Sequence, residues 1–139
     1  MDNAAIMQAV HRALHEPDSG FTFLHRFMGV RLAYADEQAT LEFDITETFF
    51  NRQGNLQGGV IAVLFDMAMG YLHRNAIGPG ITLEMKVSYL RAVQQGLVTV
   101  SARFVRKGRS ISFVEADARN ASGEVIALVS ATWKSAANA

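Results

Sequence analysis

The sequence contains no cysteine, no excess charge of either sign and no apolar run long enough to cross a membrane. The absence of cysteine excludes disulfides, thiolate nucleophiles and cysteine-ligated metals. The 13 basic side chains balance 13 acidic ones, so the overall charge favours neither nucleic acid nor an anionic membrane as a partner. The longest apolar stretch, residues 58–72, is shorter than a membrane span and carries Asp66 near its middle. We therefore expect a protein that acts on a small molecule, with no membrane or nucleic-acid partner.

Length and composition favour one domain. A chain of 139 residues with 50% apolar side chains can bury a substantial core, so we assign residues 1–139 to a single domain. The amino-terminal segment lacks the apolar run of a secretory signal, and we expect a cytoplasmic protein. Helical periodicity over residues 4–14 predicts a short covering helix.

Period-two alternation of apolar and polar residues predicts half-buried strands at residues 39–46, 81–89, 98–104, 110–119 and 124–133. Residues 21–35 show a mixed pattern and precede a turn at 36–38. In the 81–89 strand the apolar set that we expect to face the core is Ile81, Leu83, Met85, Val87 and Tyr89. The last four strands follow one another closely, so we expect an antiparallel meander.

The most informative feature is one acid, Asp66, inside an apolar helical stretch over residues 60–72. Because this helix is apolar around nearly its whole circumference, we expect a sheet to curve around it and bury it. A carboxylate among apolar side chains loses hydration in its charged form, so it needs a partner or a function. The pair Gly58-Gly59 would let a ligand approach the amides that a helix start leaves unpaired. Together these features suggest a base and an oxyanion site.

Three motifs carry a resemblance to a known family: Asn51-x-x-Gly54-x-x-Gln57-Gly58-Gly59, an acid fifteen residues after Asn51, and Thr82-x-Glu84-x-x-Val87-x-Tyr89-Leu90-Arg91. With the order of the elements, they resemble the hotdog acyl-CoA thioesterases of the phenylacetate-degradation (PaaI-like) group over roughly residues 20–134. The resemblance implies an α+β protein with the hotdog fold, in which a curved antiparallel sheet wraps around a long central helix. The chain departs from the family at Gln57, where the family usually has histidine.

The resemblance implies roles for the motif residues. In similar enzymes the acid that matches Asp66 is a general base or a nucleophile. Gly58 is our candidate for the amide that polarises the thioester carbonyl, and Gly59 would permit close approach of the substrate. Thr82 stands where related enzymes carry a hydroxyl that helps to place the attacking water, although on its own it is an ordinary outward-facing strand residue. Asn51 would bind the carboxylate, orient the substrate or only cap its loop.

Two further groups of residues have alternative interpretations. Gln57 would donate to the thioester oxygen or simply begin the helix. The phosphates of coenzyme A require basic side chains, for which the candidates are Arg91, Arg106, Lys107 and Arg109. A solvated turn that protects a sheet edge explains the hairpin members nearly as well. His11 and His15 have no third ligand nearby, so we expect no metal site. We also expect no cofactor, because coenzyme A takes part only as a portion of the substrate.

The spacing of the two main candidates bears on assembly. Gly58 and Asp66 are eight residues apart, which is about 12 Å along one helix, so one chain cannot bring both to one thioester carbon. The sequence therefore predicts a homodimer as the minimal unit, and a homotetramer is expected from the resemblance. The predicted function is hydrolysis of an acyl-CoA thioester. The alternatives are a non-catalytic acyl-CoA-binding hotdog protein and, more weakly for want of a histidine in the loop or early helix, a hydratase or dehydratase.

Overall fold

The computed structural model describes residues 2–17 and 20–136, and the other positions of the predicted domain lie outside this description. The helices are α1 (Asn3–His15), α2 (Phe23–Met28), the short 3-10 helix η1 (Glu47–Phe49) and α3 (Gly58–Ala76). The strands are β1 (Arg31–Ala35), β2 (Gln38–Asp44), β3 (Gly80–Tyr89), β4 (Leu97–Arg106), β5 (Ile111–Arg119) and β6 (Val125–Ser135). The predicted central helix and the five predicted strands are confirmed, and α2 is added within the segment of mixed pattern.

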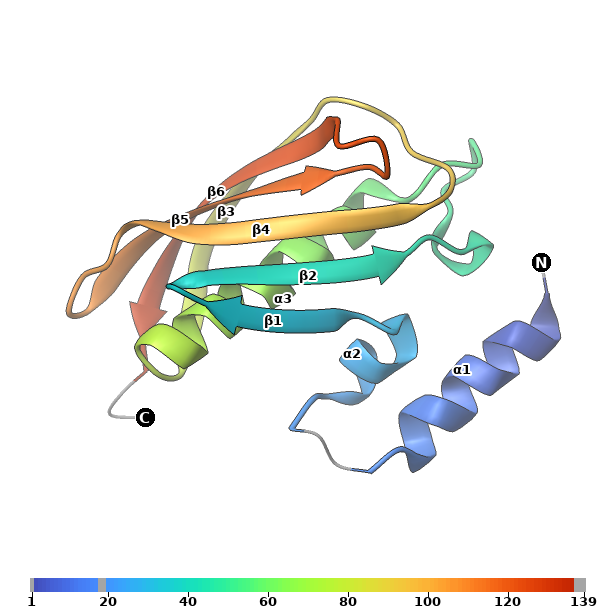
Figure 1. Cartoon of the computed structure of the whole chain (residues 1–139), viewed down its shortest axis with the longest axis horizontal. Coiled ribbons are helices and arrows are strands. Elements are labelled where there is room, and N and C mark those ends of the chain that lie inside the picture. Colours follow the sequence, from blue (N-terminus) through green and yellow to red (C-terminus); the bar gives the residue numbers. More distant parts are fainter. Residues whose placement is uncertain (1, 18–19, 137–139) are drawn as a thin grey trace.

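The six strands form one antiparallel sheet in the order β1-β2-β4-β5-β6-β3, and the sheet curves around α3 (Figure 1). Apolar side chains of its inner face pack against the helix and form the core. Fully buried examples are Leu41, Val100 and Ile126 from the sheet and Phe65 and Leu72 from the helix. The predicted α+β hotdog fold, with a curved sheet around a long central helix, is therefore confirmed.

The position of β3 corrects the predicted meander. Strands β4, β5 and β6 pair in sequence order, but β3 pairs with β6 and not with β4. Residues 90–96 cross from one strand to the other, and this segment is held by backbone hydrogen bonds from Leu90 to Ile126 and from Leu56 to Val93. Strand β3 consequently forms an edge of the sheet, and β1 forms the other edge.

A β-bulge in β3 corrects the predicted facing of this strand. The pairing with β6 shifts between Thr82 and Glu84, so that Leu83 is the extra residue. Thr82 lies opposite the buried Trp133 and shares its side of the sheet, which is the side that faces α3. The predicted inward positions Ile81 and Leu83 are instead 54% and 52% exposed. The predicted alternation of inward and outward side chains is correct only after the bulge, because one inserted residue reverses the facing of the β3 residues that precede it.

The central helix is not covered all round, which corrects the predicted burial of Asp66. The sheet buries eight residues of α3, yet a stripe along the helix stays exposed or half-buried. This stripe consists of Gly59, Val63, Asp66, Gly70 and Arg74. The spacing of three or four residues puts these positions on one face of the helix. Within its own chain Asp66 is therefore an exposed acid on an apolar helix.

Helix α1 exists where it was predicted but does not cover the sheet. It packs beside α2, outside the β1 edge (Figure 1). Only Ala13 of α1 is buried. Of the predicted apolar stripe Ile6, Met7, Val10 and Leu14, the residues Ile6 and Val10 are half-buried, whereas Met7 and Leu14 are 65% and 62% exposed. The contact with α2 includes a hydrogen bond from Arg26 Nε to the carbonyl of Ala13 at 2.9 Å. The contact face of α1 therefore contains only part of the predicted stripe.

Candidate active site

The carboxylate of Asp66 is bound by the hydroxyl of Thr82. The Thr82 Oγ1 donates to Asp66 Oδ1 at 2.6 Å, and the two residues come from α3 and β3. The contact depends on the bulge at Leu83, because that insertion turns Thr82 toward the helix. A short hydrogen bond to one carboxylate oxygen fixes the orientation of the group, and the second oxygen remains available to a ligand.

Asp66 opens into a cavity of about 650 Å³ that the chain forms on the uncovered face of α3. Most of its walls are apolar or aromatic: Phe21, Met67, Gly70, Tyr71 and Trp133. Its polar groups besides Asp66 include His25, Arg74 and Asn75. A mainly apolar pocket with a few polar groups is typical of a small-molecule site.

His25 lines the cavity, although the sequence analysis did not identify it as a candidate site residue. Its Nδ1 lies 2.7 Å from the hydroxyl of Thr22, and its ring stacks on Phe21 at a centroid distance of 5.3 Å. Burial lowers the pKa of His25 from its ordinary value of 6.5, so the ring is mainly neutral at neutral pH. Helix α2 brings it to the cavity, and α2 itself lies in the segment whose pattern predicted no element.

The start of α3 offers an unpaired amide at Gly58. This residue is the first of the helix, and no described residue accepts a hydrogen bond from its backbone N–H. Tyr89 packs against it so closely that a Cβ at Gly58 would lie 3.2 Å from the phenol ring. The Tyr89 hydroxyl donates to the Gly58 carbonyl at 2.7 Å. Partial burial raises the pKa of Tyr89 above its ordinary 10.0, so the phenol stays a donor at neutral pH.

Tyr89 is a positioning residue that the sequence reasoning missed, although it belongs to the motif that carried the resemblance. Its hydrogen bond ties the first peptide of α3 to β3. The bonded carbonyl belongs to the peptide between Gly58 and Gly59, so Tyr89 holds the first residue of α3 in place and positions the adjoining Gly58 N–H only through that residue.

Three other predicted site residues, Asn51, Gln57 and Gly59, lie near the start of α3. Asn51 accepts through its Oδ1 from the backbone N–H groups of Gln53 and Asn55 at 3.0 and 3.1 Å, so its carbonyl caps the loop. It also lines the Gly58 pocket. Gln57 precedes the helix and is exposed, and its side chain forms no capping hydrogen bond. Gly59 is exposed with open space beside it.

Gly58 and Asp66 open into different pockets of the chain. Gly58 lines a cavity of about 310 Å³ together with Asn51, Tyr89 and Arg91, and it shares no lining residue with the Asp66 cavity. Both residues belong to α3 and lie eight positions apart, so about 12 Å of helix separates them. One chain does not bring the acid and the amide together.

The four basic candidates are split within one chain. Arg91 lies beside the Gly58 pocket and pairs with Glu124 at 3.3 Å. The hairpin after β4 carries Arg106, Lys107 and Arg109, at the far end of the sheet (Figure 1). Lys107 forms an ion pair with Glu37. The expectation of one cluster that includes Arg91 is therefore not met by a single chain, since the ten residues of β4 lie between its two parts.

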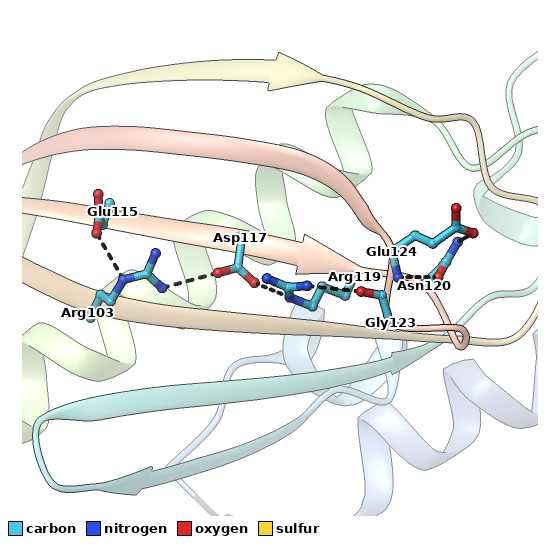
Figure 2. A network of polar contacts seen from close by, with 7 residues as sticks. All are labelled: Arg103, Glu115, Asp117, Arg119, Asn120, Gly123 and Glu124. Carbon is cyan, nitrogen blue, oxygen red and sulfur yellow. Dashed lines mark hydrogen bonds and ion pairs between the residues drawn. The ribbon is translucent and has the colours of Figure 1, made fainter.

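Other arginines on the outer face of the sheet are already paired (Figure 2). Asp117 is 8% exposed and accepts from Arg103 and Arg119, each at 3.2 Å. Arg103 also donates to Glu115 at 2.9 Å. Burial lowers the pKa of Arg103, but the hydrogen bonds to Asp117 and Glu115 raise it more, so the guanidinium stays charged. This network stabilises the sheet and offers no free cation to a phosphate.

Within residues 2–17 and 20–136, no three His, Asp or Glu side chains gather in a way that could hold a metal ion. In the same part of the chain, no helix has both the length and the apolar character that crossing a bilayer requires.

Comparison with known proteins places this geometry in a family. The model of the thioesterase superfamily matches residues 53–127, which is more than half of the chain and includes Gly58, Asp66 and Thr82. The chain belongs to the thioesterase superfamily. Acyl-coenzyme A thioesterase 13 of Mus musculus is 29% identical over 99 residues, which cover 67% of this chain and 69% of that protein.

Solved structures share the fold of this chain. A conserved protein of Pseudomonas aeruginosa is 27% identical with a TM-score of 0.78, and the match covers 85% of this chain and 98% of the other. The PaaI protein from the phenylacetic acid degradation operon of E. coli shares the fold with a TM-score of 0.79 at 15% identity, covering 91% and 94% of the two chains. The resemblance inferred from the motifs is confirmed at the level of the family, and membership indicates thioester hydrolysis as the general activity.

Proposed function

We propose that the protein is an acyl-CoA thioesterase that releases a carboxylic acid and coenzyme A. The observation that carries the proposal is the carboxylate of Asp66, which is oriented by Thr82 and opens into a largely apolar cavity. An acyl chain fits such walls, and a carboxylate at their edge can act on the thioester carbon.

In the proposed reaction, Asp66 either takes a proton from a water molecule that attacks the carbonyl carbon or attacks that carbon itself. Both routes place negative charge on the former carbonyl oxygen before the bond between carbon and sulfur breaks. When water attacks, Asp66 holds the proton of that water and passes it to the leaving thiolate. When Asp66 attacks, a mixed anhydride forms as the thiolate leaves, and a water molecule then cleaves the anhydride to the acid and restores Asp66, with one proton of that water going to the thiolate. The backbone N–H of Gly58 would stabilise the former carbonyl oxygen, and one such donor contributes about 10²- to 10³-fold in kcat. Asn51 and Gln57 would orient the substrate beside this amide.

The amide must come from a second subunit, because Gly58 and Asp66 of one chain face separate pockets. Two features support a homodimer as the smallest active unit. Strand β3 is a sheet edge with unpaired backbone groups and exposed Ile81 and Leu83, and such an edge is a template for another chain. The uncovered stripe of α3 begins at Gly59, which has open space beside it and so allows close approach of a second helix. Pairing of two such dimers into a tetramer stays a prediction, as does a phosphate-binding role for Arg91, Arg106, Lys107 and Arg109.

The decisive test is hydrolysis by the Asp66→Asn variant. We expect kcat on acyl-CoA esters to fall by about 10²- to 10⁴-fold, because the amide neither accepts a proton nor attacks carbon. Release of coenzyme A is followed with a thiol reagent, and the absence of cysteine removes any background from the protein. Thermal unfolding should change little, because Asp66 is exposed in its own chain.

The matched control is Asp36→Asn, which makes the same chemical change on the β1–β2 turn. Asp36 has a positive φ of 52°, a conformation that asparagine adopts readily, so this variant should keep full activity. Wild-type protein that binds acyl-CoA without hydrolysing it, or an Asp66→Asn variant of normal activity, would refute the proposal.

A further inference from the structure

The cavity beside Asp66 has opposite charges at its two ends. The α3 face that lines it runs from Asp66 through Gly70 to Arg74, in steps of four residues. The end positions are eight residues apart, which separates them by about 12 Å along the helix. A ligand that lies along this face with its reacting carbon at Asp66 would therefore bring its far end to Arg74.

The helix face between the two ends is apolar. Trp133 lies against the helix at Gly70, where a Cβ would come within 3.2 Å of its ring. Met67, Tyr71 and Phe21 complete these walls. An acyl chain or ring fits this segment, whereas the nucleotide of coenzyme A would bury polar groups there without partners.

Arg74 is the cationic side chain that lines the cavity. It is exposed, and no described residue forms a hydrogen bond or an ion pair with it. Its neighbour Asn75 is held by a 2.7 Å hydrogen bond from its side-chain amide to the carbonyl of Tyr71, which leaves the side-chain oxygen of Asn75 as an acceptor. The other titratable base that lines the cavity is His25, which is mainly neutral at neutral pH. A guanidinium without a partner matches a carboxylate better than any neutral group, because it can donate two parallel hydrogen bonds.

We propose that the enzyme prefers acyl groups that carry a second carboxylate at their far end, that is, monothioesters of medium-length dicarboxylic acids, and that Arg74 is the residue that selects them. This inference rests on the proposed thioesterase function. The charge of Asp66 supports this inference. Because the Asp66 carboxylate repels the free carboxylate of the substrate, the substrate binds with its thioester at Asp66 and its free carboxylate at Arg74.

The test compares pairs of coenzyme A esters of equal chain length that differ only in the terminal group. The pairs are succinyl and butyryl, adipoyl and hexanoyl, suberoyl and octanoyl, and sebacoyl and decanoyl. We expect the ratio of kcat/KM within a pair to favour the carboxylated ester by about tenfold at medium length, the value of one charge-assisted contact. The succinyl pair should show no such preference, because its carboxylate cannot span the distance to Arg74.

Variants of Arg74 separate charge from shape. Arg74→Gln should remove the preference, so that kcat/KM for suberoyl-CoA falls to the value for octanoyl-CoA in the same variant, and Arg74→Lys should keep part of the preference. The control is Lys134→Gln, which removes one exposed positive charge on β6, away from the cavity lining, and should leave the ratio as in the wild type.

Each contrary result has a distinct meaning. If octanoyl-CoA is hydrolysed but the ratio within each pair is the same in the wild type and in Arg74→Gln, the inference is wrong and the thioesterase function stands. If Arg74→Gln raises KM equally for all the esters, Arg74 binds the phosphates that they share, and the inference is again wrong. If the wild type hydrolyses none of the esters, the proposed function fails and the inference fails with it.

Discussion

The contact between Asp66 and Thr82 joins an acid that is unusual in its apolar helix to a threonine that is ordinary in its strand. Thr82 binds one carboxylate oxygen at 2.6 Å, and no described residue forms a hydrogen bond with the other oxygen. Threonine donates one proton and has no charge, so it orients the acid without neutralising it. A base or nucleophile needs this combination of fixed direction and retained charge.

His25 gives a prediction on stability as a function of pH. Burial lowers the pKa of His25 below its ordinary 6.5, so the unfolded chain takes up a proton there at a higher pH than the folded chain does. As pH falls through about 6.5 the unfolded state holds more protons, and the free energy of unfolding decreases until folded His25 is protonated as well. Replacement by glutamine, which does not titrate, should remove this part of the decrease.

The measurement is urea unfolding of the wild type and of His25→Gln at about pH 7.5 and about pH 5. His11, His15 and His73 are present in both proteins, so the difference between the two pH effects reports His25 alone. The loss of stability on acidification should be smaller in His25→Gln. An equal or larger loss in the variant would show that His25 is not held in its neutral form.

At the scale of elements, the bulge in β3 shows what the sequence pattern could and could not predict. Alternation located the strand and gave the correct side for Met85 and Val87. It gave the wrong side for Ile81 and Leu83, because a bulge adds one residue without a compositional mark. Thr82 was consequently expected to face outward, whereas it binds Asp66. The error falls at the candidate site, where a regular strand would have turned the hydroxyl away.

The start of α3 allows a test of the Gly58 amide. Gly58→Pro removes the N–H, and proline is well tolerated at the first position of a helix. The preceding Gln57 has φ −63° and ψ 134°, a conformation that a following proline favours. We expect kcat to fall by about 10²- to 10³-fold, the usual effect of losing one oxyanion donor.

The matched control is Gly58→Ala, which also adds a Cβ beside Tyr89 but keeps the amide proton. Its Cβ would lie 3.2 Å from the Tyr89 ring, so this variant measures the steric effect alone. The ratio of kcat between Gly58→Ala and Gly58→Pro therefore reports the N–H. Equal kcat values for the two variants would exclude Gly58 as the donor.

For the whole molecule, the sequence predicted which residues form strands better than how the strands are ordered. The amphipathic pattern of a strand is local, and it located five of the six strands but not β1, which lies in the segment of mixed pattern. The order depends on residues 90–96, which cross from β3 to β4 and carry no signal that separates a crossover from a hairpin. The family resemblance supplied the fold that the local patterns left open.

The sequence predicted some residues of the candidate site but not the cavity that they line. Asp66 and Gly58 stand out in the sequence because an acid in an apolar helix and a glycine pair at its start are locally unusual. The cavity was not predictable, because His25 and Phe21 reach it from a segment without clear periodicity. Arg74 is an ordinary residue near the end of a helix until the cavity shows what lies beside it. Tertiary contacts, and not local pattern, define these members of the site.

The strongest prediction for the assembly is complementation between two inactive variants. Asp66→Asn lacks the acid and Gly58→Pro lacks the amide, and each should be inactive as a homodimer. If every site takes its acid from one subunit and its amide from the other, a mixed dimer contains one site with both defects and one intact site. Random mixing after co-expression should therefore restore about a quarter of the wild-type activity, since half of the dimers are mixed and half of their sites are intact.

Mixing without subunit exchange is the control and should restore nothing. A co-expressed mixture that stays inactive although mixed dimers are isolated from it would contradict a site shared between subunits, because sites formed within single chains gain nothing from a partner.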